Sequence, residues 1–145
     1  MIEIETSDTP RESARPVVRS IRRGWHQVCP ACGGGRLYRA YLKVEDACPT
    51  CREALYHHRA DDAPPYFTIL IVAHIVVGGL LLMEQALAPP TWLHLAIWLP
   101  LTVLLSLLLL PRIKGALIGL QWALRMHGFA EADEKPADPT AQKIT

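Results

Sequence analysis

Four cysteines in two matching pairs carry the strongest chemical signal in the sequence. Cys29 and Cys32 form one Cys-x-x-Cys pair, and fifteen residues later Cys48 and Cys51 form another. Each pair can offer two thiolates to one ion about 2.3 Å away, provided that the intervening chain returns and brings the pairs together. The spacing therefore predicts a four-thiolate site, and structural Zn²⁺ is the ion that we expect. Four protein thiolates leave no open position for water, so we expect no catalysis there.

The same four cysteines permit other interpretations. A rubredoxin-like iron site is one, because Cys-Pro-x-Cys pairs also bind iron. A dithiol redox pair and disulfide bonds are the others, and a reducing cytoplasm disfavours the disulfides. The sequence shows no second redox partner, so zinc stays the preferred ion and iron the alternative.

The segment around the cysteines, residues 24–56, is predicted to fold as a small zinc ribbon with a short β-hairpin. Gly33, Gly34 and Gly35 permit the positive backbone angles that follow a Cys-x-x-Cys turn, whereas Arg52 follows the second turn, where glycine would be easier. Residues 37–44 alternate in the manner of a strand. A fold this small has little core, so metal binding should be nearly equivalent to folding.

Two apolar runs follow the ribbon and must position it. Residues 66–88 contain one formal charge, Glu84, near their end, and residues 91–110 contain none. About 20 apolar residues, each rising about 1.5 Å, match a hydrocarbon core of about 30 Å. We therefore predict a mainly α membrane protein whose two-span transmembrane helical hairpin covers residues 66–110.

The charges around these runs predict their orientation. Residues 11–59 contain ten Arg or Lys against four Asp or Glu, whereas residues 84–91 between the runs contain no Arg or Lys. Beyond the second run come Arg112, Lys114 and Arg125. Positive flanks stay on the cytoplasmic side. We therefore expect both termini in the cytoplasm. The first 24 residues lack the apolar core of a signal peptide, so the first span should act as its own insertion signal.

A second set of potential metal ligands lies in residues 57–65, between the ribbon and the first span. The set consists of His57, His58, Asp61 and Asp62. Imidazole and carboxylate groups suit zinc or another divalent ion. The interpretation that we favour is a polar collar at the lipid headgroups, in which Asp62 caps a helix whose first turn contains Pro64 or Pro65.

Polar side chains inside the spans also require an explanation, because they are costly there and often functional. Glu84 and His94 flank the turn at similar depths, so they either meet across the hairpin or extend separately to the interface. His74 lies roughly 12 Å deeper than His94 by helix rise. We expect His74 to hydrogen-bond the partner helix or another protein, with a cofactor or proton role as the alternative. Gly78 and Gly79 permit close helix approach.

The remaining segments are polar or amphipathic. Residues 1–23 and 130–145 are predicted to be disordered polar tails. Residues 111–129 have a helical pattern with a narrow polar stripe, which predicts a C-terminal amphipathic helix lying in the interface or folded back on the hairpin. Gly115 and Gly119 have the spacing that allows close helix packing. The candidate contacts for lipid headgroups or other anions are Arg19, Arg22, Arg23, Arg112 and Lys114.

Two further stretches, residues 61–66 (DDAPPY) before the first span and residues 111–115 (PRIKG) after the second, complete a recognisable order. With the cysteines, they make residues 24–129 resemble a family of small bacterial zinc-ribbon membrane proteins, catalogued as domain of unknown function 983. The resemblance implies a cytoplasmic zinc ribbon on two spans of the bacterial inner membrane. In some of these genomes the family's gene lies beside those for cytochrome c oxidase subunits and their copper-assembly factor, which implies a role in respiratory oxidase biogenesis.

Three functions are compatible with this sequence. It shows no nucleophile–base group, phosphate-binding loop or open metal site, which favours a non-catalytic accessory or assembly protein that contacts the lipid bilayer and another membrane protein or a second copy of itself. The second is a membrane-tethered zinc ribbon that binds nucleic acid or the ribosome through Arg19, Arg22, Arg23, Arg36 and Arg39. The third is a metal-handling membrane protein with ligands among His57, His58, Asp61, His74 and His94.

Overall fold

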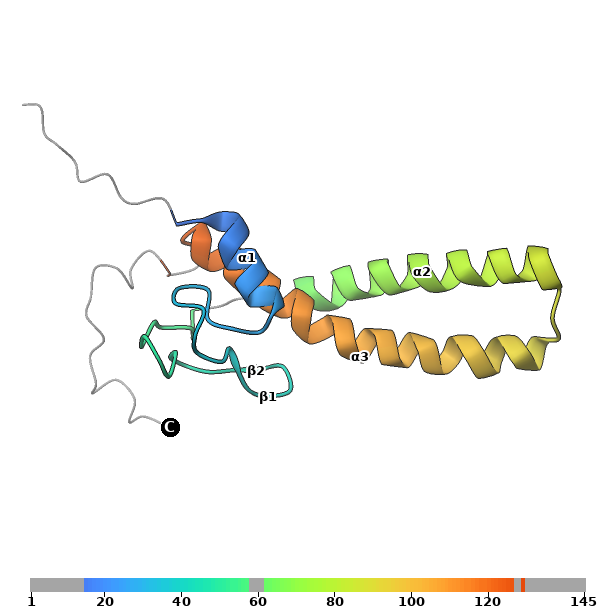
Figure 1. The fold of residues 1–145 in the computed structure, drawn as a ribbon, viewed down its shortest axis with the longest axis horizontal. Helices are drawn as coiled ribbons and strands as arrows, with labels where there is room; N and C mark the ends of the chain where they lie inside the picture. The colour runs from blue at the N-terminus through green and yellow to red at the C-terminus, as the bar shows by residue number, and fades with distance from the viewer. Residues whose placement is uncertain (1–14, 58–61, 127–128, 130–145) are drawn as a thin grey trace, which may run out of the picture.

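Helices dominate the structure, a computed structural model that describes residues 15–57, 62–126 and 129. Two long apolar helices lie side by side as a hairpin, and a small ribbon and a short helix surround one end of it (Figure 1). The elements in chain order are α1 (Val17–Trp25), β1 (Tyr38–Ala40), β2 (Lys43–Val44), α2 (Ala63–Leu87) and α3 (Thr91–Ala123). The predicted class, a helical hairpin with a small four-cysteine β-ribbon, is confirmed.

Helix α2 begins where the sequence predicts. Asp62 is its N-cap residue, and the first turn contains prolines, whose missing N–H groups would have no partner there anyway. The Asp62 side chain makes no cap hydrogen bond, so that part of the prediction is wrong. The helix ends at Leu87, because the next residue, Ala88, adopts a left-handed conformation before the turn to α3.

Helix α3 continues through Pro100 and Pro111 for 33 residues. The prediction of a separate amphipathic helix after Pro111 is therefore wrong, because residues 111–123 are the last part of α3. Proline lacks an N–H, so Pro111 leaves the carbonyl of Leu107 without its helical donor. The hydroxyl of Tyr41 donates to that oxygen at 3.0 Å, and the ribbon in this way compensates for the proline.

Helix α1 occupies part of the segment predicted to be a disordered tail, so that prediction is wrong for residues 17–23. It lies along the last part of α3 (Figure 1). A Cβ on Gly24 would collide with the backbone of Gly115, and one on Gly119 would collide with that of Ser20. Small residues four apart on each helix therefore let the two backbones touch, and this contact orders α1.

The ribbon encloses a small core. Strands β1 and β2 are antiparallel and pair Tyr38 with Val44, and Leu42 turns the chain with a φ of +60°. Residues 37–44, predicted as one strand, therefore fold back on themselves. The core consists of Cys29, Leu37, Val44, Cys48 and Leu55 with Ile118 of α3, all buried.

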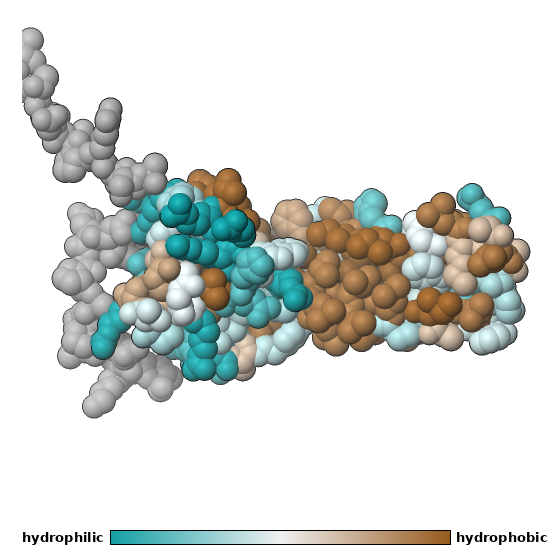
Figure 2. Space-filling view, in the orientation of Figure 1, coloured by the Kyte–Doolittle hydropathy of each residue, from teal (hydrophilic) through white to brown (hydrophobic). Residues whose placement is uncertain are grey.

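The surface divides into two parts. The hairpin of α2 and α3 presents hydrophobic side chains, whereas hydrophilic surface gathers around the ribbon and α1 (Figure 2). Both helices are long and apolar enough to span a membrane, and only 11% of the most apolar stretch of α2 and none of that of α3 is buried. Where the helices meet, Gly79 leaves space for the ring of Trp98, whereas Gly78 faces away from any neighbour.

Candidate metal centre

The two cysteine pairs form the same backbone turn. In the first, the N–H of Gly33 donates to the carbonyl of Cys29 at 2.9 Å, and in the second the N–H of Arg52 donates to that of Cys48 at 2.9 Å. Gly33 has a φ of +75° and Arg52 a φ of +60°. Glycine adopts this conformation freely, whereas arginine does so at a cost of about 1 kcal/mol. Both positions were predicted from the sequence to need such an angle.

Backbone N–H groups point at the sulfurs. The N–H of Gly34 donates to Sγ of Cys32 and the N–H of Thr50 to Sγ of Cys48, each at 3.4 Å. Gly35 contributes differently, because a Cβ there would collide with Sγ of Cys48. The three glycines after the first pair therefore have three roles. Gly33 makes the turn, the N–H of Gly34 donates a hydrogen bond to a sulfur, and Gly35 leaves space for the sulfur of Cys48.

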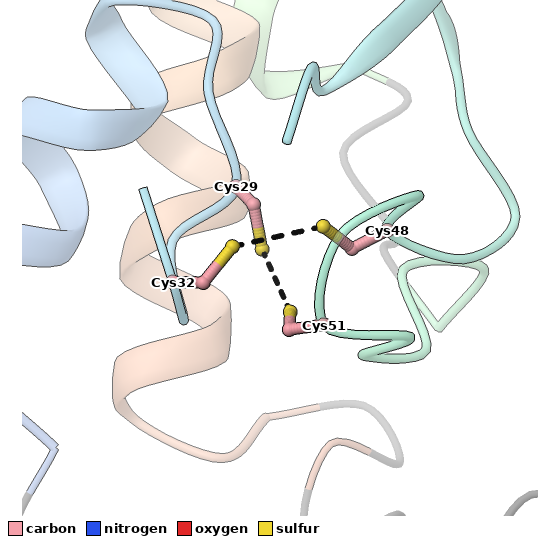
Figure 3. A group of neighbouring side chains, drawn as sticks. All are labelled: Cys29, Cys32, Cys48 and Cys51. Carbon is pink, nitrogen blue, oxygen red and sulfur yellow. Dashed lines mark hydrogen bonds between the residues drawn. The ribbon is translucent and has the colours of Figure 1, made fainter. Parts of the chain in front are cut away.

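All four sulfurs converge on one point (Figure 3). Sγ of Cys29 lies 3.7 Å from that of Cys51, Sγ of Cys32 lies 3.8 Å from that of Cys48, and all four lie within 4.8 Å of one another. Four sulfurs arranged tetrahedrally around an ion at about 2.3 Å would be about 3.8 Å apart. The distances are far longer than the roughly 2.05 Å of a disulfide. Among the described residues, the four cysteines therefore form a cluster that fits one tetrahedral metal ion.

The protein environment distinguishes the four thiols. Burial raises the pKa of Cys29 well above its ordinary value, and desolvation also raises the pKa of Cys51. The N–H of Gly34 instead lowers the pKa of the exposed Cys32 to about 6. Metals bind thiolates, and of these three cysteines Cys32 is the one whose thiolate form the surroundings favour.

Helix α3 closes the ribbon on one side. Ile118 is fully buried among the core residues next to Cys29 and Cys48. Nε1 of Trp122 donates to Oε1 of Glu53 at 2.8 Å, and the carbonyl of Glu53 accepts the N–H of Cys48 at 2.9 Å. The second cysteine turn is therefore connected to α3 through one residue. No local pattern indicated this contact, because its two residues lie far apart in the sequence.

Helix α1 holds the first cysteine turn. Nη1 of Arg23 donates to the carbonyls of Pro30 at 3.0 Å and Ala31 at 2.6 Å. Arg15, just before α1, places its guanidinium 4.2 Å from the ring centre of Trp122 and donates to the carbonyl of the same residue at 2.7 Å. These bonds join α1, the ribbon and α3 into one unit around the sulfurs.

A model of a family described as protein of unknown function (DUF983) matches residues 38–122, more than half of the chain. The chain belongs to this family. The matched region starts in β1 and ends at Trp122, so it contains Cys48 and Cys51 but neither Cys29, Cys32 nor α1. It is narrower than the resemblance over residues 24–129. No curated protein and no solved structure matches the chain.

Two of the four collar residues of this DUF983 chain, His57 and Asp62, lie within the described part of the chain. His58 and Asp61 lie outside the described residues, so their proposed metal site with His57 and Asp62 stays untested. The ring of His57 stacks on that of Tyr56 at 4.0 Å and meets the edge of Phe129 at 5.9 Å. Asp62 is exposed.

The histidines of the hairpin occupy two separate places. Nε2 of His94 lies 2.9 Å from Oε2 of Glu84, so the two residues meet across the turn. His74 is exposed on α2, and its Nδ1 donates to the carbonyl of Leu70 in the same helix at 2.7 Å. The expected hydrogen bond from His74 to the partner helix is therefore not formed, and a hydrogen bond from His74 to another protein stays a prediction.

The basic residues also differ in their surroundings. Besides Arg23, Nε of Arg36 pairs with Glu45 at 3.1 Å and Nη1 of Arg39 pairs with Asp46 at 3.6 Å. Arg112 donates to the carbonyl of Leu108 at 2.8 Å and Lys114 to that of Leu42 at 2.9 Å. Arg19 and Arg22 are exposed on α1. Arg23 therefore has a structural role that the sequence did not indicate.

Proposed function

We propose that this chain is a non-catalytic membrane accessory protein that holds a zinc ribbon at a set position on a two-span helical hairpin. The observation that supports this function is the continuity of α3, which starts in the apolar hairpin and ends in the ribbon, where Ile118 and Trp122 are buried. A movement of the hairpin must therefore be transmitted to the ribbon. Such an arrangement suits a protein that positions or assembles a partner.

The exposed apolar surface supports the membrane location. Large side chains such as Ile69, Leu82, Leu95 and Leu99 are each more than half exposed along the hairpin. Soluble proteins seldom expose contiguous apolar surface on this scale. A lipid bilayer would cover it, so the full chain should stay in the membrane fraction after an alkaline carbonate wash and should require detergent for extraction.

The charges support an orientation with the ribbon and both termini on the cytoplasmic side of a bacterial inner membrane. The described basic residues lie at the ribbon end, and the turn between α2 and α3 has none. A reporter enzyme that is active only outside the cytoplasm tests this orientation. It should be inactive when fused after Thr145 and active when inserted at Pro89; the reverse pattern would contradict the orientation.

The ion that we propose for the centre is Zn²⁺. Four thiolates in tetrahedral arrangement suit zinc and leave no position for water or substrate, which supports a structural role. Iron would use the same ligands, and its thiolate complex would absorb visible light. A colourless protein with one zinc per chain is the expected result.

The partner is proposed to be another membrane protein or a second copy of this chain, and the specific process to be haem-copper oxidase biogenesis. The gene neighbourhood implied by the family resemblance is the support for this process. A strain without the gene should lose haem-copper oxidase content, and the wild-type gene should restore it, whereas a Cys48→Ser gene should not. Unchanged oxidase content in the deletion strain would refute the role in oxidase biogenesis, but not the proposal of a membrane-bound zinc ribbon.

Nucleic-acid binding and metal handling remain weaker alternatives. Three of the five arginines considered for nucleic acid, Arg23, Arg36 and Arg39, make contacts within the protein. Binding of the purified chain to RNA with a steep salt dependence would support the first alternative. More than one metal equivalent per chain would support the second.

A further inference from the structure

The β1–β2 hairpin lies against α3 at the level where its apolar part ends. Tyr38 donates to the carbonyl of Pro111 at 2.8 Å, and Tyr41 donates to that of Leu107 at 3.0 Å. Leu107 lies about 6 Å further into the apolar part than Pro111 by helix rise. The tip of the hairpin therefore reaches the depth at which, in the proposed membrane, headgroups meet hydrocarbon.

An open pocket of about 310 Å³ lies between this hairpin and α3. Its lining includes Gln27, Tyr38, Arg39, Tyr41 and Pro111, and none of its lining residues is acidic. The side chain of Arg39 is 42% exposed and that of its partner Asp46 is 62% exposed, and Nη1 of Arg39 lies 3.6 Å from Oδ2 of Asp46. An ion pair this exposed is weak, so Arg39 can donate to a ligand in the pocket.

Further positive charges surround the hairpin tip. Lys43 is exposed on β2, and Arg112 and Lys114 are on α3 next to Pro111. The side chain of Lys114 turns toward the hairpin tip, because it donates to the carbonyl of Leu42. The side chain of Arg112 turns toward the apolar part of α3, because it donates to the carbonyl of Leu108. Glu45 is paired with Arg36, so it offsets little of this charge. The surroundings of the pocket are therefore suited to an anion.

We propose that this pocket binds the phosphate headgroup of one anionic phospholipid from the adjacent leaflet. The pocket offers a guanidinium and two tyrosine rings at headgroup depth, and the neighbouring lysines supply the complementary charge. The proposal rests on the proposed membrane location. It narrows a general attraction between basic residues and lipid to one site, in which Arg39 contacts the phosphate and Tyr41 forms part of the wall.

The test uses the full chain, purified in detergent, and native mass spectrometry with phosphatidylglycerol or phosphatidylcholine of the same acyl chains. The wild type should retain one phosphatidylglycerol in preference to phosphatidylcholine. Arg39→Gln should weaken phosphatidylglycerol binding about fivefold, the effect of one cationic group near the surface. Arg52→Gln is the matched control. It removes one exposed charge from the second cysteine turn, next to Glu53, which contacts Trp122 about 16 Å along α3 from Pro111.

The controls separate the competing explanations. Metal content equal to that of the wild type shows that Arg39→Gln is folded. Equal retention of both lipids, or an equal loss of phosphatidylglycerol binding in the two variants, would refute the proposed lipid site in the pocket. Neither result would contradict the membrane location. Displacement of the lipid by inorganic phosphate at constant ionic strength would also overturn it, in favour of a site for free phosphate. A chain that stays in solution without detergent would instead refute the proposed function.

Discussion

Tyr41 donates a hydrogen bond at 3.0 Å to the carbonyl of Leu107, the group that Pro111 leaves without a backbone donor. Tyr38 donates to the carbonyl of Pro111 itself at 2.8 Å. Two tyrosines of the ribbon therefore bind α3 at a turn where a proline removes one helical hydrogen bond. The ribbon and the continuous helix therefore support each other at this point.

Tyr41→Phe should destabilise the ribbon end of the detergent-solubilised protein by about 1 kcal/mol, because the Leu107 carbonyl loses its donor. Chemical denaturation followed by tryptophan fluorescence measures the effect. Tyr56→Phe is the control, since Tyr56 is also an exposed tyrosine of the ribbon and should change stability little.

The same bond permits a sharper test with Pro111→Ala. Alanine restores the N–H that serves Leu107 within the helix, so Tyr41→Phe should cost much less in that background than in the wild type. An equal cost in both backgrounds would show that the Tyr41 hydroxyl does not replace the missing donor.

Gly115→Ala should separate α1 from α3, because the added Cβ would meet the backbone of Gly24. Overpacking of this kind costs about 1–3 kcal/mol, and the gain in helix propensity is about 1 kcal/mol. Trypsin should therefore cleave α1 faster after Arg19 and Arg22. Gly78→Ala adds the same methyl group where nothing lies within 4 Å and should leave cleavage unchanged; equal protection in both variants would contradict the close helix contact.

Metal analysis of the purified chain should find one zinc per chain. Cys29→Ser and Cys48→Ser should each lose it, and with it the folded ribbon, because each removes a buried ligand from a fold that depends on the ion. The helicity of α2 and α3 within the membrane should remain. His57→Ala should retain the zinc, and a fold that survives complete removal of the metal would contradict a structural site.

Zinc should protect all four cysteines from iodoacetamide at pH 7, because the ion holds each sulfur. Removal of the metal should unfold the ribbon, so the four cysteines should then react at similar rates. In a ribbon that stayed folded without metal, Cys32 would react first and Cys29 last, because Cys32 is exposed with a pKa lowered from 9.0 to about 6, whereas Cys29 is buried with a raised pKa. Peptide mass spectrometry of the modified cysteines distinguishes these outcomes.

The local residue pattern was sufficient to predict those parts of the fold that depend on residues close together in the sequence. The two Cys-x-x-Cys pairs predicted the cluster, because four sulfurs at this spacing have one favourable arrangement around an ion. The uninterrupted apolar runs predicted the two long helices, and the equal depths of Glu84 and His94 allowed their meeting to be foreseen as one of two outcomes. In each case the residues that determine the structure are neighbours or are related by simple helix geometry.

Contacts between distant segments decided the rest. Residues 17–25 are too few to form a stable helix alone, and their helix packs on α3 where Ser20 and Gly24 meet Gly119 and Gly115. Pro111 predicts a helix end when considered locally, whereas α3 continues, and Tyr41 supplies the donor that the carbonyl of Leu107 lacks. A residue pattern indicates which conformation a segment favours on its own. The free energy of these contacts depends instead on a second segment, which folding brings from elsewhere in the chain.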